Sequence, residues 1–495
     1  MPTHGVPTSN DPPAAPDGAL TAGAVAAEPR GSLTTLVLLV LGVFSYLTME
    51  MMVAPIVPFV QQELGITPSQ SAWMLTGLLV VGAVCLPLAT RYADIADKKK
   101  VFLVVLGLSG IGAAIAALAT TAPLLIAGQM LQGVGVAVVP IAIGIMRDSQ
   151  PLSRARTANT IFVVSGGLGA AVAYVAVGPI VTHLHYSYIY WFPTIVIAAV
   201  VLVGLRALPS CPPVAGGTVD WTGAVLLGAA LVALLLGLTF PTSLGWGSPL
   251  VLGLLVLTIA LLAVFAVVER RHPSPLVDLR GLAEREVLGV MSINTAHSIA
   301  TFVMYVILPT VALLPVAIGY GMGGDASTAG LVLLPYALLV VVAGPTAQRL
   351  EPLLGRRGTM ILGAVLIVAA GLVLLGIGSA PWTPYLCSAL MGLGLGIGFT
   401  QSLNTIVRVV PAERVASASG AVYVVRSVGG VLGGQIAGAI LSAGLTAAGA
   451  PSWGAILANV LLIVALGVVS IGLSYLLASR RSTATATAVL TPAQA

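Results

Sequence analysis

Glu50 is the residue of this sequence whose type and surroundings point most directly to chemistry. It is the only charged residue between Arg30 and Glu63, in the stretch YLTMEMMVAP. A charged side chain at bilayer depth costs about 2.5–3.5 kcal/mol on insertion scales, so an acid inside an apolar run is a candidate functional group. We interpret Glu50 as a protonatable or cation-binding site. The alternative is an acid that reaches the outer headgroups or is held by a neighbouring side chain.

Other polar side chains interrupt long apolar runs in the same way. An imidazole changes charge near neutral pH, so His297 is a second candidate for proton coupling, although a neutral hydrogen-bonding ring is the alternative. Gln129, Asn294, Arg426 and Tyr423 are further polar candidates within apolar runs. Arg426 has a structural alternative, because a guanidinium can also hold two helices together. No spacing resembles a metal site or a nucleophile triad, and we expect neither a metal nor a cofactor.

Membrane helices are the elements that must position these groups. The chain is 58% hydrophobic and 7% charged, whereas soluble domains are about 25% charged. A soluble protein of 495 residues could not form a polar surface from this composition. The sequence therefore predicts an all-α polytopic membrane protein. In a membrane protein the positions of the charges matter more than the net charge of +5, so we expect no nucleic-acid partner.

Fourteen apolar stretches are long enough to cross a hydrocarbon core about 30 Å thick, which needs roughly twenty helical residues. They are 33–58, 71–90, 101–119, 122–146, 158–181, 189–208, 221–240, 250–268, 287–309, 328–348, 359–378, 383–406, 417–440 and 454–478. We expect residues 1–32 and 479–495 to be disordered tails, and the first apolar run to be a retained span.

The basic residues support this count. Every Lys and Arg except Arg426 lies in a tail, in one of the alternate loops, or close to such a loop. The intervening loops, such as QQELGITPSQ, THLHYSY and PTSLGWGSP, contain none. The positive-inside rule therefore predicts that both termini are cytoplasmic, in a protein of the plasma membrane.

Four stretches together resemble the major facilitator superfamily. TRYADIADKKK (90–100) resembles its cytoplasmic signature, and QMLQGVGVAVVP (129–140) resembles its fourth-span motif. LVLLPYALLVVVAGPTAQRLEPLLGRRG (331–358) is similar to the second-half repeat of the signature. VPAERVASASGAVYVVRSVGGVLGG (410–434) resembles the penultimate-helix region of the fourteen-span drug:proton antiporters.

This resemblance implies a major facilitator fold of two six-helix bundles around a central cavity. We expect Gln129, Asn294, Arg426 and Tyr423 to line that cavity and contact the substrate. We expect the bundles at 33–208 and 287–478, with two linker transmembrane helices at 209–268 and a cytoplasmic connector at 269–286. The seventh and eighth spans support this division, because they contain no charged or amide side chain and suit lipid better than a water-filled path.

The resemblance also implies a conformational lock at the cytoplasmic signature, formed by Asp94, Arg91 and Lys98. The chain departs from the family pattern at several positions. Thr90 and Asp97 replace the two signature glycines, and Gln129 replaces a fourth-span arginine that the family associates with proton coupling. The first-span acid of the family lies one position before Glu50, at Met49.

Three glycines of the thirteenth span recur every four residues. Gly430, Gly434 and Gly438 share one helix face in this spacing, as small residues do where two backbones approach closely. We expect this face to pack against a neighbouring helix.

We interpret the protein as a secondary active transporter, not an enzyme, that exports amphipathic drugs, antibiotics or secondary metabolites by alternating access, in exchange for protons. The expected partners are a small-molecule substrate, protons and the lipid bilayer, with a monomer as the expected state. One alternative is a proton-coupled or facilitative importer on the same fold. Another is a non-transporting membrane sensor.

Overall fold

The computed structural model describes residues 33–66, 68–150, 152–212, 220–272, 285–376, 380–409, 415–446 and 449–478. Both predicted tails and most of the predicted connector 269–286 lie outside the described residues.

The described chain is built from helices. The long elements are α1 (Leu33–Leu64), α2 (Pro68–Ile95), α3 (Lys98–Ala117), α4 (Ala122–Gln132), the 3₁₀ turn η1 (Gly133–Ala137), α5 (Val138–Ser149), α6 (Leu152–His183), α7 (Tyr188–Ala207), α8 (Trp221–Thr239), α10 (Pro249–Arg271), α12 (Arg285–Leu313), α14 (Leu334–Leu374), α15 (Thr383–Val409), α16 (Val415–Ala443) and α17 (Trp453–Ala478). The short ones are α9 (Pro241–Leu244), η2 (Val316–Ile318) and α13 (Ala326–Leu331).

Thirteen helical segments of the described chain are long and apolar enough to cross a membrane. One of them is long enough to cross it twice. This segment, Ala326–Leu374, has 49 residues, and its backbone leaves the helical conformation at Gly355, with φ 69° and ψ 168°. The parts of α14 on either side of Gly355 both pack against α15. A Cβ on Gly392 of α15 would lie 2.9 Å from Cα of Tyr336, and one on Gly363 would lie 2.9 Å from the carbonyl oxygen of Gly394. The chain therefore forms the fourteen spans that the sequence predicts.

The fourth span contains a feature that the sequence did not predict. Its helix narrows to a 3₁₀ turn at Gly133–Ala137, between α4 and α5. A Cβ on Gly133 would lie 3.0 Å from the amide nitrogen of Gly82 in α2, and one on Gly135 would overlap the ring of Tyr46 in α1. The glycines thus let α2 and Tyr46 approach the fourth span closely.

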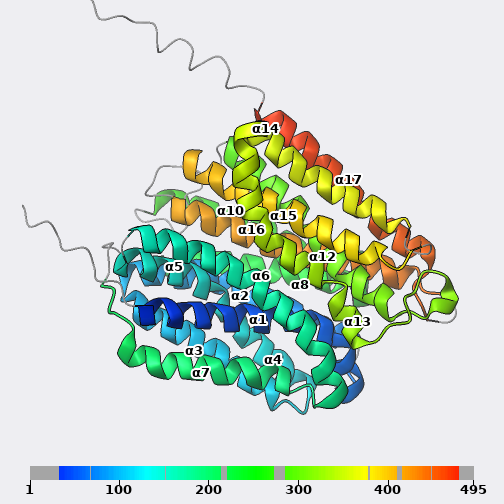
Figure 1. Cartoon of the computed structure of the whole chain (residues 1–495), viewed down its shortest axis with the longest axis horizontal. Coiled ribbons are helices and arrows are strands. Elements are labelled where there is room, and N and C mark those ends of the chain that lie inside the picture. Colours follow the sequence, from blue (N-terminus) through cyan, green and yellow to red (C-terminus); the bar gives the residue numbers. More distant parts are fainter. Residues whose placement is uncertain are drawn as a thin grey trace, which may run out of the picture.

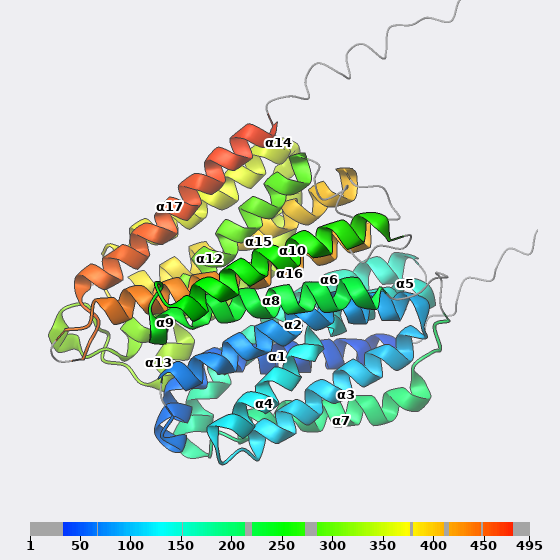
Figure 2. The same ribbon diagram turned by 180° about the vertical axis from the view of Figure 1, so that it is seen from behind.

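The spans form two halves with six spans each (Figure 1). Helices α1 to α7 make up the N-terminal half, and α12 to α17 make up the C-terminal half. The intervening helices α8 and α10 lie together across the back of the molecule (Figure 2). α8 contacts both α2 of one half and α16 of the other. This is the architecture of two six-helix bundles with two extra helices between them.

The molecule has a basic end, near Lys98 and Arg356, and an opposite end, where α1 finishes at Leu64. At the opposite end one continuous apolar core runs through both halves. At the basic end the buried side chains of the two halves form separate cores, and Val424 of α16 makes the contact between the C-terminal half and the core of the other half. In Figure 1 the halves converge toward α13 and diverge away from it. The described helices of the two halves are therefore packed together at the opposite end, which we call the closed end, and diverge toward the basic end, which we call the open end.

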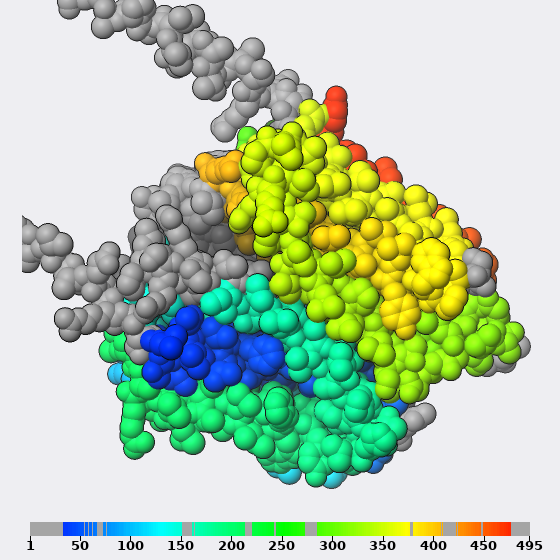
Figure 3. All heavy atoms as spheres, in the orientation of Figure 1, coloured from blue at the N-terminus to red at the C-terminus, as the bar shows by residue number. Residues whose placement is uncertain are grey.

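Glycines let the backbones of the two halves meet at the closed end. A Cβ on Gly178 of α6 would lie 2.6 Å from Cα of Ser327 in α13, and one on Gly167 would lie 2.8 Å from the carbonyl oxygen of Ala337. A Cβ on Gly330 would overlap the carbonyl oxygen of Tyr174. Figure 3 shows the surface of α6 meeting that of α13 and the start of α14. We call this contact the α6–α13 seal.

The seal generates a first prediction. A Gly178→Val side chain would collide with Ser327, and overpacking of this kind costs about 1–3 kcal/mol. We expect the closed end to open, because that cost falls on the closed state alone and shifts the equilibrium by roughly 5- to 150-fold. The measurement is the rate at which a water-soluble maleimide labels Ala329→Cys, a buried position of α13, after the three native cysteines are replaced by alanine.

Gly472→Val in α17 is the matched control, because no atom lies within 4 Å of a Cβ at that position. An equal labelling rate in the two valine variants would contradict the role of the seal.

Candidate functional site

The candidate site is centred on Glu50, close to the midpoint of the 32-residue helix α1. Its carboxylate lies beside the hydroxyl of Tyr46, one helical turn earlier, and within electrostatic range of Arg426. Tyr46 is almost fully buried, and its ring fits the notch at Gly135. Arg426 belongs to α16, so the two opposite charges come from opposite halves. Glu50 is partly exposed even at this depth.

Aromatic side chains surround this charge pair. The guanidinium carbon of Arg426 lies 5.5 Å from the ring centroid of Phe399 in α15. Phe302 and Tyr305 of α12 make an edge-to-face contact at 5.5 Å, and Tyr305 makes another with Tyr336 of α14 at 5.4 Å. Phe302, Tyr305 and Phe399 are partly exposed, whereas Tyr336 is buried. These rings therefore form an apolar wall on the C-terminal side of the site.

Tyr174 continues the aromatic wall into the N-terminal half. It lies on α6, where its hydroxyl donates to Sδ of Met51 at 3.8 Å. The same hydroxyl lies beside Tyr305 and within electrostatic range of Glu50. Because the backbone of Tyr174 is part of the α6–α13 seal, the site adjoins the closed end directly.

The structure places three other predicted site residues inside the halves. Gln129 is fully buried and donates from Nε2 to the hydroxyl of Tyr190 in α7, 2.7 Å away. Asn294 donates to the carbonyl oxygen of Val290 in its own helix at 3.0 Å. His297 is almost fully buried and packs against Gly398 of α15. These three side chains are not grouped around Glu50.

The side chain of Tyr423 lies outside the described residues. Its helix, α16, carries the predicted glycine face, and the packing differs from the expectation. Gly430 packs on the ring of Phe302, as expected, but no atom lies within 4 Å of a Cβ on Gly434 or Gly438. The close approach to α12 is made one residue earlier in each turn.

Gly429 and Gly433 form the face of α16 that contacts α12. A Cβ on Gly429 would lie 3.0 Å from the carbonyl oxygen of Thr295, and one on Gly433 would lie 2.9 Å from Cα of Ile299. Sequence reasoning missed these two glycines because each is the first of a Gly-Gly pair, and both members of a pair fit the same spacing.

The predicted lock residues lie together at the basic end of the N-terminal half. Asp94 is within electrostatic range of both Lys98 and Arg91. Nζ of Lys98 forms an ion pair with Asp148 of α5 at 2.6 Å, and Lys98 is largely buried. Asp148 was not predicted, although it is an acid at the end of the fourth span. The cluster joins α2, α3 and α5 into one unit.

Asp97, which replaces a family glycine, has a role in this half that the sequence did not predict. Its side chain caps α3 by accepting from the amide of Lys99 at 3.0 Å. It also accepts from Ser210 Oγ at 2.7 Å and from the amide of Cys211 at 3.0 Å, beyond α7. Burial acts to raise the pKa of Asp97, but these hydrogen bonds outweigh it and hold the pKa below its usual value. Asp97 therefore stabilises α3 and fastens the segment after α7.

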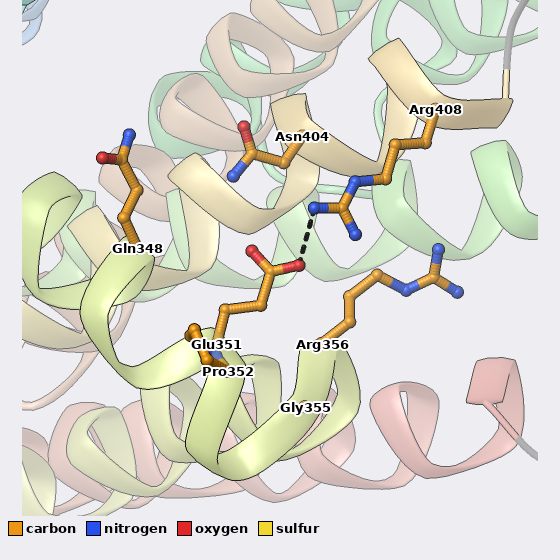
Figure 4. A pocket seen from close by; sticks show the side chains of 7 residues that line it. All are labelled: Gln348, Glu351, Pro352, Gly355, Arg356, Asn404 and Arg408. Carbon is orange, nitrogen blue, oxygen red and sulfur yellow. Dashed lines mark ion pairs between the residues drawn. The ribbon is translucent and has the colours of Figure 1, made fainter.

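A pocket of about 650 Å³ with several charged and amide residues in its lining lies at the basic end of the C-terminal half (Figure 4). It is lined by Gln348, Glu351, Pro352, Gly355, Arg356, Asn404 and Arg408. Glu351 forms an ion pair with Arg408 at 2.8 Å and accepts from Gln401 at 3.2 Å. Arg356 lies 3.5 Å from Glu286. These contacts join α12, α14 and α15, so the C-terminal half also has its own bracing.

The fold and this central site define a polytopic membrane transporter rather than an enzyme, with two helical halves around a polar centre. The chain belongs to the Major Facilitator Superfamily, whose family description matches residues 39–223 and 214–434.

Curated relatives include proteins named for antibiotic resistance. The puromycin resistance protein pur8 of Streptomyces alboniger is 32% identical over 410 residues, covering 79% of this chain and 78% of the relative. The tetracenomycin C resistance and export protein of Streptomyces glaucescens is 26% identical over 419 residues, covering 82% and 76%.

Solved transporter structures share the fold. The POT family transporter PepTSo superposes with a TM-score of 0.64 at 14% identity, over 90% of this chain and 98% of that one. The nucleoside transporter NupG superposes with a TM-score of 0.58 at 15% identity, over 89% and 99%.

The glycine face of α16 generates a second prediction. Gly433→Ala places a methyl group against the backbone of Ile299, and we expect a loss of stability of about 1–3 kcal/mol. Gly434→Ala meets no neighbouring atom and replaces glycine with the best helix former, so we expect no loss. Thermal unfolding of the two purified variants in one detergent measures the difference. Equal unfolding temperatures would contradict the assignment of Gly433 to the packing face.

Proposed function

We propose that this transporter is a secondary active exporter of amphipathic drugs, antibiotics or secondary metabolites in the plasma membrane, and that it exchanges them for protons. The observation that carries the proposal is the position of Glu50. It is an acid at mid-depth, partly exposed between the halves and faced by Arg426 from the other half. An acid in such a position can exchange a proton with whichever side the centre is open to.

Proton exchange at Glu50 would change the attraction between the halves. Ionised Glu50 attracts Arg426 across the interface, whereas protonated Glu50 does not. The proton also supplies the energy, because one charge moving down 100 mV gives about 2.3 kcal/mol, a roughly fiftyfold concentration ratio for the coupled solute. His297 remains a second candidate for proton coupling.

The direction of transport is part of the proposal. We place the basic end and both termini in the cytoplasm, in line with the positive-inside rule. The open end then faces the cytoplasm, where an exporter collects its substrate. The two relatives named above, one for puromycin resistance and the other for tetracenomycin C resistance and export, support export over import.

We further propose that the cluster of Arg91, Asp94 and Lys98 acts as a lock when the basic end closes. Its charges lie at the basic end of the N-terminal half and join α2, α3 and α5. The bundles at 33–208 and 287–478 are the two moving units of this mechanism.

Glu50→Gln is the variant that tests the proposal. We expect wild type, expressed in a strain that lacks its own exporters, to raise resistance to several amphipathic toxic compounds, and Glu50→Gln to lose that protection. In proteoliposomes we expect wild type to move protons when a transported drug gradient is imposed. We expect the variant to lose that movement, because a glutamine side chain cannot release a proton.

Glu63→Gln is the matched control, because Glu63 lies on the same helix but is exposed at the opposite end beside His185. Unchanged proton movement in Glu50→Gln would remove Glu50 from the coupling. Accumulation of the compounds inside cells that express wild type would show an importer.

A further inference from the structure

The centre of the site presents two charges of opposite sign on opposite walls. Glu50 is carried by α1 of the N-terminal half and Arg426 by α16 of the C-terminal half, within electrostatic range of each other. Both side chains are partly exposed. A solute bound between the two side chains would therefore meet a carboxylate on one side and a guanidinium on the other.

The wall around the guanidinium is aromatic. Phe399 lies under Arg426 at 5.5 Å, and Phe302 and Tyr305 form the adjoining surface, with their rings 5.5 Å apart. Aromatic faces and edges bury a planar ring well, and edge-to-face contacts add about 0.5–1.5 kcal/mol beyond the buried area. Met51, partly exposed on the Glu50 side, adds an adaptable apolar contact.

These two charges favour three classes of aromatic solute to different extents. A cation gains from Glu50 but is placed near the positive charge of Arg426. An anion meets the reverse arrangement. A solute with both a basic and an acidic group places a charge of opposite sign beside each of the two protein charges.

We infer that the site takes amphoteric aromatic solutes, with the basic group toward Glu50, the acidic group toward Arg426, and the planar ring against Phe302, Tyr305 and Phe399. This inference rests on the proposed export function and names the substrate class of the same site. Such a solute links the two halves directly, because each of its charged groups is held by a different half.

A matched pair of fluorescent probes tests the inference. Tetramethylrhodamine with a free carboxylate is a zwitterion, and its methyl ester is a cation with the same ring system. We measure binding of each probe to the purified full-length protein by fluorescence polarisation. We expect Arg426→Gln to lower the preference for the zwitterion over the ester by roughly tenfold, the loss of one charge-assisted contact. Arg426→Lys, which keeps the charge, should retain most of the preference.

Comparing the ratio between variants removes the effect of detergent partitioning, which is the same for each probe in every variant. Arg408→Gln is the control, because it removes an arginine at the basic end, beside Glu351, and should leave the ratio as in wild type. Glu50→Gln should weaken both probes, because each carries the cationic ring system.

Two results would overturn the inference: a ratio unchanged in Arg426→Gln, or a fall of the ratio in Arg408→Gln as large as in Arg426→Gln. Neither result would touch the export proposal, which is tested by resistance and proton movement. Conversely, wild type could show the predicted dependence of the probe ratio on Arg426 and yet move no protons. That result would support the binding inference and contradict the proposed proton exchange.

Discussion

The attraction between Glu50 and Arg426 is the interaction on which the proposed mechanism depends, because it connects chemistry at one side chain to the distance between the halves. At an effective dielectric constant of ~20, two unit charges attract by about 3 kcal/mol at ~5 Å and by about half of that at ~10 Å. A rocking motion that separates the halves therefore changes this attraction by about 1.5 kcal/mol. That is comparable to the energy of about 2.3 kcal/mol that one proton gains across 100 mV.

Such a motion requires halves that move as units, and the structure contains the contacts for this. Lys98 and Asp148 brace the N-terminal half at the basic end, while Glu351 with Arg408 brace the C-terminal half. At the opposite end the seal joins backbones at Gly178 and Gly330, so closing it orders few side chains. Strong bracing within each half and a seal of small residues between them favour rigid-body rocking over local rearrangement.

The sequence predicted the spans because membrane helices must be long and apolar, a constraint that composition reveals directly. It pointed to Glu50 and Arg426 as candidate site residues because isolated charges in such spans are expensive, and the structure places the two within electrostatic range. It did not predict which way a polar side chain faces. The glycine pairs of α16 show why: a rotation of about 100° per residue separates Gly433 from Gly434, yet both belong to runs spaced by four. The 3₁₀ turn at Gly133–Ala137 was not predicted either, because it accompanies close contacts with α2 and Tyr46 that lie far away in the sequence.

The resemblance implies an arginine where this chain has Gln129, and the proposed mechanism needs no charge at that position. Gln129 is hydrogen-bonded to Tyr190 inside the N-terminal half, so a charge there would move with Glu50 and keep a constant distance from it. Arg426 lies in the other half, so its distance from Glu50 changes whenever the halves move. A fixed charge can only alter how readily Glu50 binds a proton. A charge across the interface makes that readiness depend on conformation, and in the proposed mechanism this dependence would couple a proton to transport.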